Sequence, residues 1–198
     1  MSKITSAAAP KAARHSMTTR TLAGCALLAA MSVVLARFVI PMPAVDQRFS
    51  LEAVPIFIAG MLFGPIPGAL VGFSADLVGC LFSGYGYNPL FCVPPILYGL
   101  SAGLFRPLLL KKTTPLTIGL SFLPPVALGS ILYQSATLAY VYGKGAFLPN
   151  FLVKLSTRSV QFAITFVLDV LVVYLLYKSK VFTAVRLWPA AQKTEDKE

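Results

Sequence analysis

The last apolar segment of this 198-residue chain carries polar side chains at a helical spacing. Four residues stand at positions i, i+3, i+7 and i+11, and therefore share one helix face: Arg158, Gln161, Thr165 and Asp169. Ionisable groups inside a membrane segment are costly and by default indicate a function. We expect this face to point into a helix bundle, where it either contacts a ligand or forms an internal polar network.

The depth of each group in its segment separates these two roles. Arg37, Arg158 and Gln161 lie near the side that we predict to face outward, and we interpret them as ligand contacts. Asp76 and Asp169 lie deeper. For these two carboxylates an ion-pair and hydrogen-bond network that fixes packing is the favoured interpretation, and a ligand role stays open.

Two other regions add hydrogen-bonding and aromatic groups. The fifth apolar segment offers Ser130, Tyr133, Gln134, Thr137 and Tyr140 at adjoining positions. The glycine-rich connection 83–89 carries three further candidates: Tyr85, Tyr87 and Asn88. Aromatic residues at a membrane interface are often only belt residues. Two tyrosines among glycines equally suit a lid that stacks on a flat ring.

The inventory of reactive side chains argues against an enzyme. The single histidine, His15, lies in the N-terminal tail, so no Ser–His or Cys–His pair and no histidine metal cluster can form. The cysteines at 25, 80 and 92 have no metal-ligand spacing, and we interpret them as small buried hydrophobes. A phosphate-binding glycine loop with a Lys-Ser/Thr ending is also missing from the sequence. We therefore expect no catalytic residues, no metal and no cofactor.

Composition places the chain in the membrane. Hydrophobic residues make up 57% of it and charged residues only 12%, whereas soluble domains carry about a quarter charged residues. Between positions 49 and 105 the only charged side chains are Glu52 and Asp76. The net charge of +10 comes from basic residues in the tails and short connections. That distribution is typical of the positive-inside rule and argues against nucleic-acid binding.

Turn residues and charge clusters divide the chain into a basic tail (1–20), a membrane domain (21–178) and a charged tail (179–198). We predict an all-α protein with six transmembrane helices in a compact bundle. The predicted spans are 22–40, 51–63, 68–82, 90–110, 116–140 and 157–177. The basic clusters place both termini and the 106–112 connection in the cytoplasm. The connections 41–50, 83–89 and 142–154 then face outward and carry the binding loops.

Several motifs resemble the folate-specific S components of energy-coupling factor (ECF) vitamin importers. They cover most of residues 21–178 and include these stretches: Arg48-Phe-Ser-Leu-Glu-Ala-Val-Pro55, Ala59-Gly-Met-Leu-Phe-Gly-Pro65, Gly68-Ala-Leu-Val-Gly72, Ala75-Asp76-Leu77-Val-Gly79 and Gly84-Tyr-Gly-Tyr-Asn-Pro-Leu-Phe-Cys-Val-Pro-Pro95. The resemblance implies a subunit of the cytoplasmic membrane that captures folate from outside. It also implies that the subunit works with a transmembrane coupling protein and two ATPase subunits. Ala26 and Ala30 stand at the spacing of the family's Ala-xxx-Ala surface for the coupling protein.

Folate chemistry agrees with this set of side chains. The flat pterin suits aromatic and amide groups, and the two carboxylates of the glutamate tail call for cations, for which we favour Arg37 and Arg158. Glu52 either accepts from the pterin amino group or caps a helix. The expected substrate-binding residues are Arg37, Phe49, Glu52, Tyr85, Tyr87, Asn88, Gln134, Arg158 and Gln161. Two alternatives stay open: an S component for thiamine, riboflavin or a queuosine precursor, and a membrane scaffold or enzyme.

Overall fold

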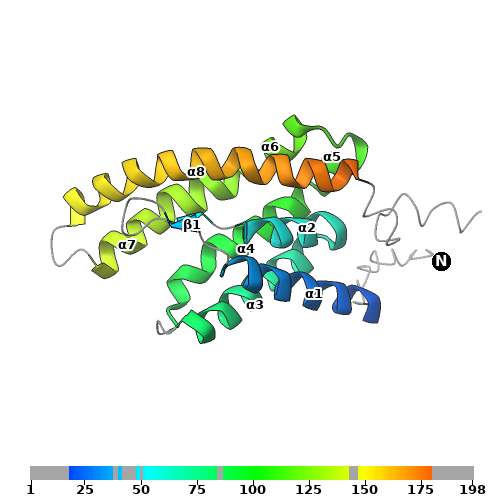
Figure 1. Cartoon of the computed structure of the whole chain (residues 1–198), viewed down its shortest axis with the longest axis horizontal. Coiled ribbons are helices and arrows are strands. Elements are labelled where there is room, and N and C mark those ends of the chain that lie inside the picture. Colours follow the sequence, from blue (N-terminus) through cyan, green and yellow to red (C-terminus); the bar gives the residue numbers. More distant parts are fainter. Residues whose placement is uncertain are drawn as a thin grey trace, which may run out of the picture.

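The structure is a computed structural model that describes residues 18–37, 40–41, 48–49, 51–83, 87–142 and 147–179. Helices dominate it, and together they form an elongated bundle (Figure 1). The helices and strands are α1 (Thr19–Leu35), β1 (Ile40–Pro41), β2 (Arg48–Phe49), α2 (Ala53–Phe63), α3 (Pro65–Ser83), η1 (Pro89–Cys92), α4 (Val93–Leu104), α5 (Arg106–Lys111), α6 (Pro115–Pro124), η2 (Pro125–Tyr133), α7 (Gln134–Tyr142) and α8 (Phe147–Lys178). Each of the six predicted apolar segments contains a helix, so the helical class of the fold is confirmed.

Helices α2, α3 and α4 pack together so closely that glycines form their contacts. A Cβ atom added at Gly99 would collide with the backbone of Gly68, and one added at Gly60 would collide with the carbonyl oxygen of Gly99. Small residues at such crossings let helices approach to backbone contact in lipid. Gly64 separates α2 from α3 with a φ of 104°, a conformation that favours glycine. The Phe-Gly-Pro sequence is therefore a tight reversal, and α3 begins directly at Pro65.

The C-terminal half is built from two long antiparallel helical segments. Residues 115–142 run as α6, η2 and α7 without interruption, and η2 has the wider π-helical turn over Pro125–Tyr133. Two consecutive prolines, Pro124 and Pro125, lie at the start of this wider turn. Their missing N–H groups remove the α-helical hydrogen bonds that would otherwise continue there. Helix α8 then returns along the whole length of this segment (Figure 1).

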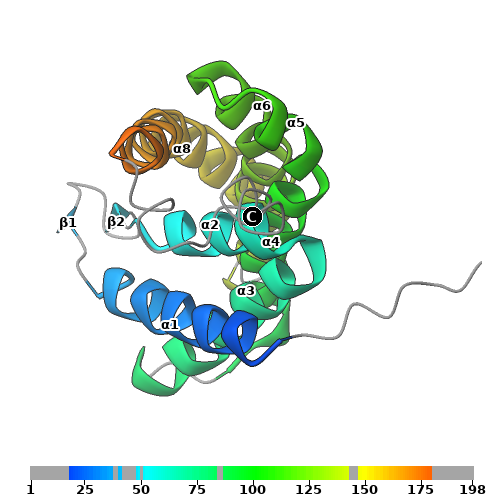
Figure 2. The same ribbon diagram turned by 90° about the vertical axis from the view of Figure 1, so that its right-hand side faces the viewer.

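The two halves meet around a buried core. Figure 2 shows α1 and α8 on opposite sides of the molecule, with α2 between them. The rings of Phe57 from α2 and Phe122 from α6 stack at a centroid distance of 3.9 Å, and both side chains are fully buried. Tyr98 of α4 meets Phe122 edge to face at 6.0 Å. These three aromatic residues join the glycine-packed half to the C-terminal half.

Three predicted boundaries are wrong. The first helix ends at Leu35 instead of reaching residue 40. The fourth segment is broken at Phe105, because Pro107 has no N–H with which to continue α4, and α5 follows as a separate short helix. Helix α8 begins at Phe147, ten residues before the predicted start, so much of the predicted 142–154 connection is helical. Pro149 is tolerated there because it lies in the first turn of the helix.

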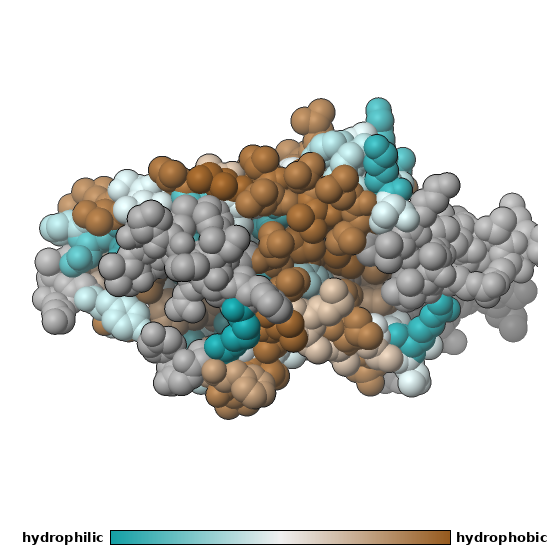
Figure 3. Space-filling view, in the orientation of Figure 1, coloured by the Kyte–Doolittle hydropathy of each residue, from teal (hydrophilic) through white to brown (hydrophobic). Residues whose placement is uncertain are grey.

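The described helices have the hydropathy of a membrane protein. Three are long and apolar enough to cross a bilayer: Pro65–Phe82, Pro115–Tyr142 and Phe147–Lys178. Three other apolar helices are shorter: Thr19–Leu35, Ala53–Phe63 and Pro89–Leu104. Large apolar side chains such as Leu116, Leu81 and Val160 are exposed on the outside of the bundle. Figure 3 shows hydrophobic side chains gathered over the middle of one face and hydrophilic ones near its α5–α6 end.

Candidate functional site

The polar face predicted for the last segment does point into the bundle. Gln161, Thr165 and Asp169 of α8 expose only 6%, 8% and 2% of their surface. Their neighbours Val160, Ile164 and Leu168 are exposed. The spacing in the sequence therefore predicted this face correctly, and α8 places a line of polar groups along the inside of the protein.

The carboxylate of Asp169 is the most unusual member of this line. Its Oδ1 atom is buried and has no hydrogen-bond partner among the described residues. A buried polar atom without a partner is uncommon in folded proteins, because it loses its water without compensation. The hydroxyl of Ser135 in α7 is likewise fully buried and lacks a partner in the described part of the chain.

Groups from α4 and η2 lie near the same line. The hydroxyls of Tyr98 and Ser130 are 3.0 Å apart and share a buried hydrogen bond. The charges of Asp169, Glu52 and Arg158 all act on Tyr98, with Asp169 the strongest of the three. Helices α4, η2 and α8 thus contribute polar groups to one interior region.

Arg158 lies at the N-terminal end of the α8 line. Its guanidinium carbon sits 5.4 Å from the centroid of the Phe162 ring, one turn along the helix. The side chain is partly buried, and the contact with the ring holds the planar guanidinium in place. A fixed, partly desolvated guanidinium is well suited to binding a carboxylate in a bidentate manner.

Arg37 has a different environment. Its Nη2 atom donates a hydrogen bond of 2.8 Å to the carbonyl oxygen of Gly79, which ties the end of α1 to α3. Helices α1 and α8 lie on either side of α2 (Figure 2). The hydrogen bond to Gly79 occupies one N–H donor of Arg37, and the pairing of Arg37 with Arg158 as binders of one glutamate tail stays a prediction.

The connection between α3 and η1 is anchored through a chain of hydrogen bonds. The hydroxyl of Tyr87 lies 3.0 Å from the thiol of Cys92, and that thiol donates to Asp76 Oδ2 at 2.8 Å. The hydrogen bond to Cys92 is the main reason that the pKa of Tyr87 is raised to about 12. Asn88 caps η1, since its side-chain oxygen accepts from the N–H of Leu90 at 3.1 Å. Asp76 thus takes part in packing.

The remaining expected contacts fall in several places. Glu52 stands at the N-terminus of α2 but makes no side-chain capping hydrogen bond, and its carbonyl accepts from the Ser32 hydroxyl at 2.8 Å. Gln134 is half-buried at the start of α7. Phe49 lies in β2, paired with Ile40, and only its backbone is described. Tyr85 lies outside the described residues.

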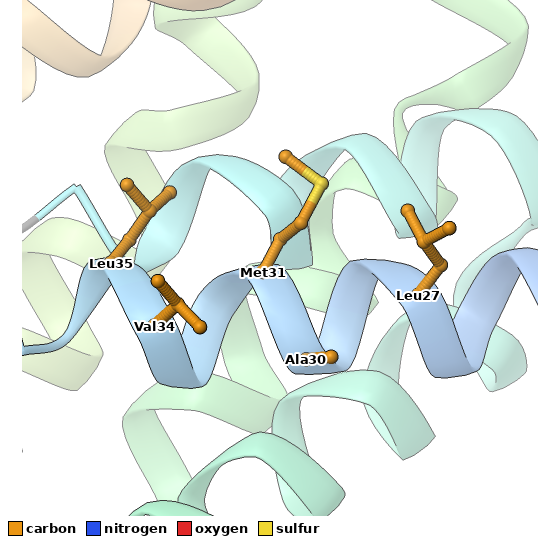
Figure 4. Close-up of a pocket in the computed structure, with 5 residues that line it drawn as sticks. All are labelled: Leu27, Ala30, Met31, Val34 and Leu35. Carbon is orange, nitrogen blue, oxygen red and sulfur yellow. The ribbon is translucent and has the colours of Figure 1, made fainter.

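Helix α1 presents a groove on its outer face. Leu27, Met31 and Leu35 form one side of it and Ala30 and Val34 the other (Figure 4). Ala26 and Ala30 are both exposed. The small side chain of Ala30 leaves the helix backbone accessible, which favours the approach of another helix.

Sequence reasoning missed Tyr98 and Ser135 as members of the interior region. Tyr98 was detectable in principle, because it is the one hydroxyl-bearing aromatic residue in the apolar stretch 93–104. Ser135 gave no such indication, since serines are common in membrane helices. Among the described residues there is also no group of three or more His, Cys, Asp or Glu side chains that could hold a metal ion.

Comparison with known proteins identifies the class of protein. Residues 16–179 match the family described as ECF-type riboflavin transporter, S component. The crystal structure of FolT bound with folic acid is 30% identical and superposes with a TM-score of 0.68, covering 80% of this chain and 94% of that one. The chain belongs to the S components of ECF transporters. It is accordingly a membrane-embedded substrate-binding subunit and not an enzyme.

Two further similarities carry less information. The S-component for biotin from an ECF-type ABC transporter has a TM-score of 0.56 at 19% identity, covering 80% of this chain and 91% of that one, and supports the fold alone. A protein of Mycoplasma pneumoniae described as an uncharacterized MG098 homolog is 36% identical over 64 residues. This match spans 32% of the present chain and only 13% of the Mycoplasma protein.

Proposed function

We propose that this protein is the high-affinity folate-binding subunit of an ECF-type vitamin importer. The observation that carries the proposal is the likeness to FolT bound with folic acid, at 30% identity over nearly the whole of that chain. The interior polar line of α8 supports it independently. Folate has a hydrogen-bonding pterin at one end and carboxylates at the other, and this line offers both acceptors and a guanidinium.

Within this proposal Arg158 binds a carboxylate of the glutamate tail. Its guanidinium is held over Phe162, and Gln161 stands next to it on the buried face. Gln134 on the facing segment and Tyr87 and Asn88 near the α3–η1 connection are further proposed contacts, together with Phe49 and Tyr85. Arg37 is a weaker candidate than Arg158, because its guanidinium already donates a hydrogen bond to the carbonyl oxygen of Gly79.

The proposal extends to topology and partners. We place six helices across the cytoplasmic membrane, with both termini in the cytoplasm. Basic residues near both ends and in the α5 region, such as Arg20, Lys112 and Lys178, support this orientation. The groove beside Ala30 is the proposed contact for the transmembrane coupling protein, which would pass the energy of two ATPase subunits to this chain.

Riboflavin is a second candidate substrate, and one observation favours it. The matching family is described by riboflavin transport and covers residues 16–179. Riboflavin is flat like the pterin, but it is uncharged and would not need the guanidinium of Arg158. The two candidates are therefore distinguished by the importance of that side chain for binding.

Binding by the detergent-purified chain tests the proposal. Folate, riboflavin and thiamine would be titrated against the wild type, Arg158→Ala and the control Lys111→Ala, which changes an exposed cation at the far end of the bundle. Tight folate binding that weakens by about 1.5–3 kcal/mol only in Arg158→Ala supports the proposal, because a charged hydrogen-bond partner is lost. Saturable binding of riboflavin without any binding of folate would contradict the proposal and would make riboflavin the substrate.

A further inference from the structure

Asp169 is the one carboxylate in the described part of the chain with a buried oxygen that lacks a hydrogen-bond partner. On the same face of α8, the Thr165 hydroxyl donates to the carbonyl of Gln161 at 2.8 Å. The Tyr98 and Ser130 hydroxyls bind each other. Asp169 Oδ1 is left as a buried acceptor with no donor in the described part of the protein. A buried carboxylate oxygen without a donor in the described part of the protein is well placed to accept a hydrogen bond from a bound ligand.

The positions of Asp169 and Arg158 indicate how an elongated ligand would be oriented along α8. The two residues are eleven positions apart on the same helix face, which corresponds to a separation of ~16 Å along the axis. Arg158 lies nearer the start of α8 and is partly exposed, whereas Asp169 is deeper and 2% exposed. The line thus begins with the guanidinium of Arg158 and finishes with the buried carboxyl group of Asp169. An elongated ligand with carboxylates at one end and N–H donors at the other matches this arrangement.

We infer that the Asp169 carboxylate recognises the 2-amino-4-oxopyrimidine head of the ligand, accepting hydrogen bonds from its exocyclic amino group and the adjacent ring N–H. This inference rests on the proposed function, because folate carries such a head in its pterin. The two parallel donors of the head match the two oxygens of a carboxylate, as the donors of a guanidinium do. The head therefore lies deep and the glutamate tail lies at Arg158.

Specificity follows from the same geometry. A site with a buried acceptor rejects a ligand that lacks the matching donor, because the acceptor then stays desolvated and unpaired. The isoalloxazine of riboflavin has no exocyclic amino group, so it presents one donor where the pterin presents two. Glu52 lies close enough for its charge to act on Asp169. Since Glu52 is exposed and stands at the start of α2, we assign the buried end of the head to Asp169.

The test compares ligands that differ only in the head. Folate, 2-desamino folate and a 7-deazaguanine would be titrated against the purified full chain and Asp169→Asn. The matched control is Asp76→Asn, which changes a carboxylate in another helix that binds Cys92. In the wild type we expect folate to bind on the order of tenfold or more tighter than its 2-desamino analogue. In Asp169→Asn this ratio should fall close to one, and Asp76→Asn should keep it.

The outcomes separate the inference from the proposed function. Folate binding with an unchanged ratio in Asp169→Asn overturns the inference and leaves the proposed function in place. If the wild type binds the deazaguanine instead of folate and Asp169→Asn loses it, folate is the wrong substrate but the head recognition stands. Failure of the wild type to bind any ligand with this head would contradict both the inference and the proposed function. A general loss of folding would lower all affinities together and would leave the ratio between ligands unchanged, which also counts against the inference.

Discussion

The thiol of Cys92 donates a hydrogen bond to Asp76 Oδ2 at 2.8 Å and joins the start of the fourth membrane segment to the middle of α3. The Tyr87 hydroxyl lies 3.0 Å from the same sulfur on its other side. A thiol is a weak donor, and a carboxyl oxygen is a good acceptor for it. The sequence analysis left Asp76 between packing and ligand contact, and the structure gives it a packing role.

The energetic link between Asp76 and Cys92 can be measured with a double-mutant cycle. We expect Asp76→Asn and Cys92→Ala each to lower the stability of the detergent-solubilised protein, by about 1–2 kcal/mol, because each leaves the other group without its partner. The double variant should cost less than the sum of the two. Thermal unfolding of the four proteins gives the coupling directly, and strictly additive effects would show that the bond contributes nothing.

Tyr87 provides a spectroscopic test of the same chain of hydrogen bonds. Its pKa is raised to about 12, first by the hydrogen bond to Cys92 and then by burial. A pKa raised in the folded state stabilises the protein below the ordinary tyrosine pKa, and that contribution disappears as the pH rises to about 12. The 295 nm absorbance difference between wild type and Tyr87→Phe should titrate well above the ordinary value. Cys92→Ala should move the titration back toward it, and an unmoved midpoint would argue against the bond.

The glycine contacts between α3 and α4 predict a position-specific effect of a single methyl group. Gly99→Ala places a Cβ against the backbone of Gly68, which cannot yield without separating the helices, so we expect a loss of several kcal/mol. Gly79→Ala is the matched control, because its Cβ would have no neighbour within 4 Å. Folded yield and melting temperature of the two variants provide the comparison. Equal behaviour of both would mean that the close approach is absent.

The stacked pair Phe57–Phe122 should be the largest single contribution to the junction between the two halves. Both side chains are fully buried and their rings are 12° from parallel. Phe57→Ala removes the ring from a packed core, and we expect it to cost about 3–5 kcal/mol. Phe57→Leu should cost less, since it refills much of the volume. Phe73→Ala, at an exposed aromatic position in α3, is the control. Chemical denaturation in mild detergent can rank the three.

The sequence predicted the helices of the fold and the buried polar face of the last helix. Hydropathy and turn residues located every main helix, and the i, i+3, i+7, i+11 pattern correctly placed Gln161, Thr165 and Asp169 inside. Local composition could not reveal the break at Phe105 or the early start of α8, because prolines are tolerated at helix starts and disruptive elsewhere. The partners of Arg37 and Asp76 depend on which helices lie side by side, and periodicity within one helix contains no such information.

The shortness of α2 has a consequence for the helices around it. Its eleven residues span only ~16 Å, about half of a hydrocarbon layer of about 30 Å. The pairing of Ile40 with Phe49 and of Pro41 with Arg48 immediately precedes α2. Extended backbone cannot face the hydrocarbon of a bilayer, and it persists only where protein or water shields it. Such a short helix, preceded by paired extended backbone, therefore requires that the neighbouring helices shield the polar groups of the strands from lipid.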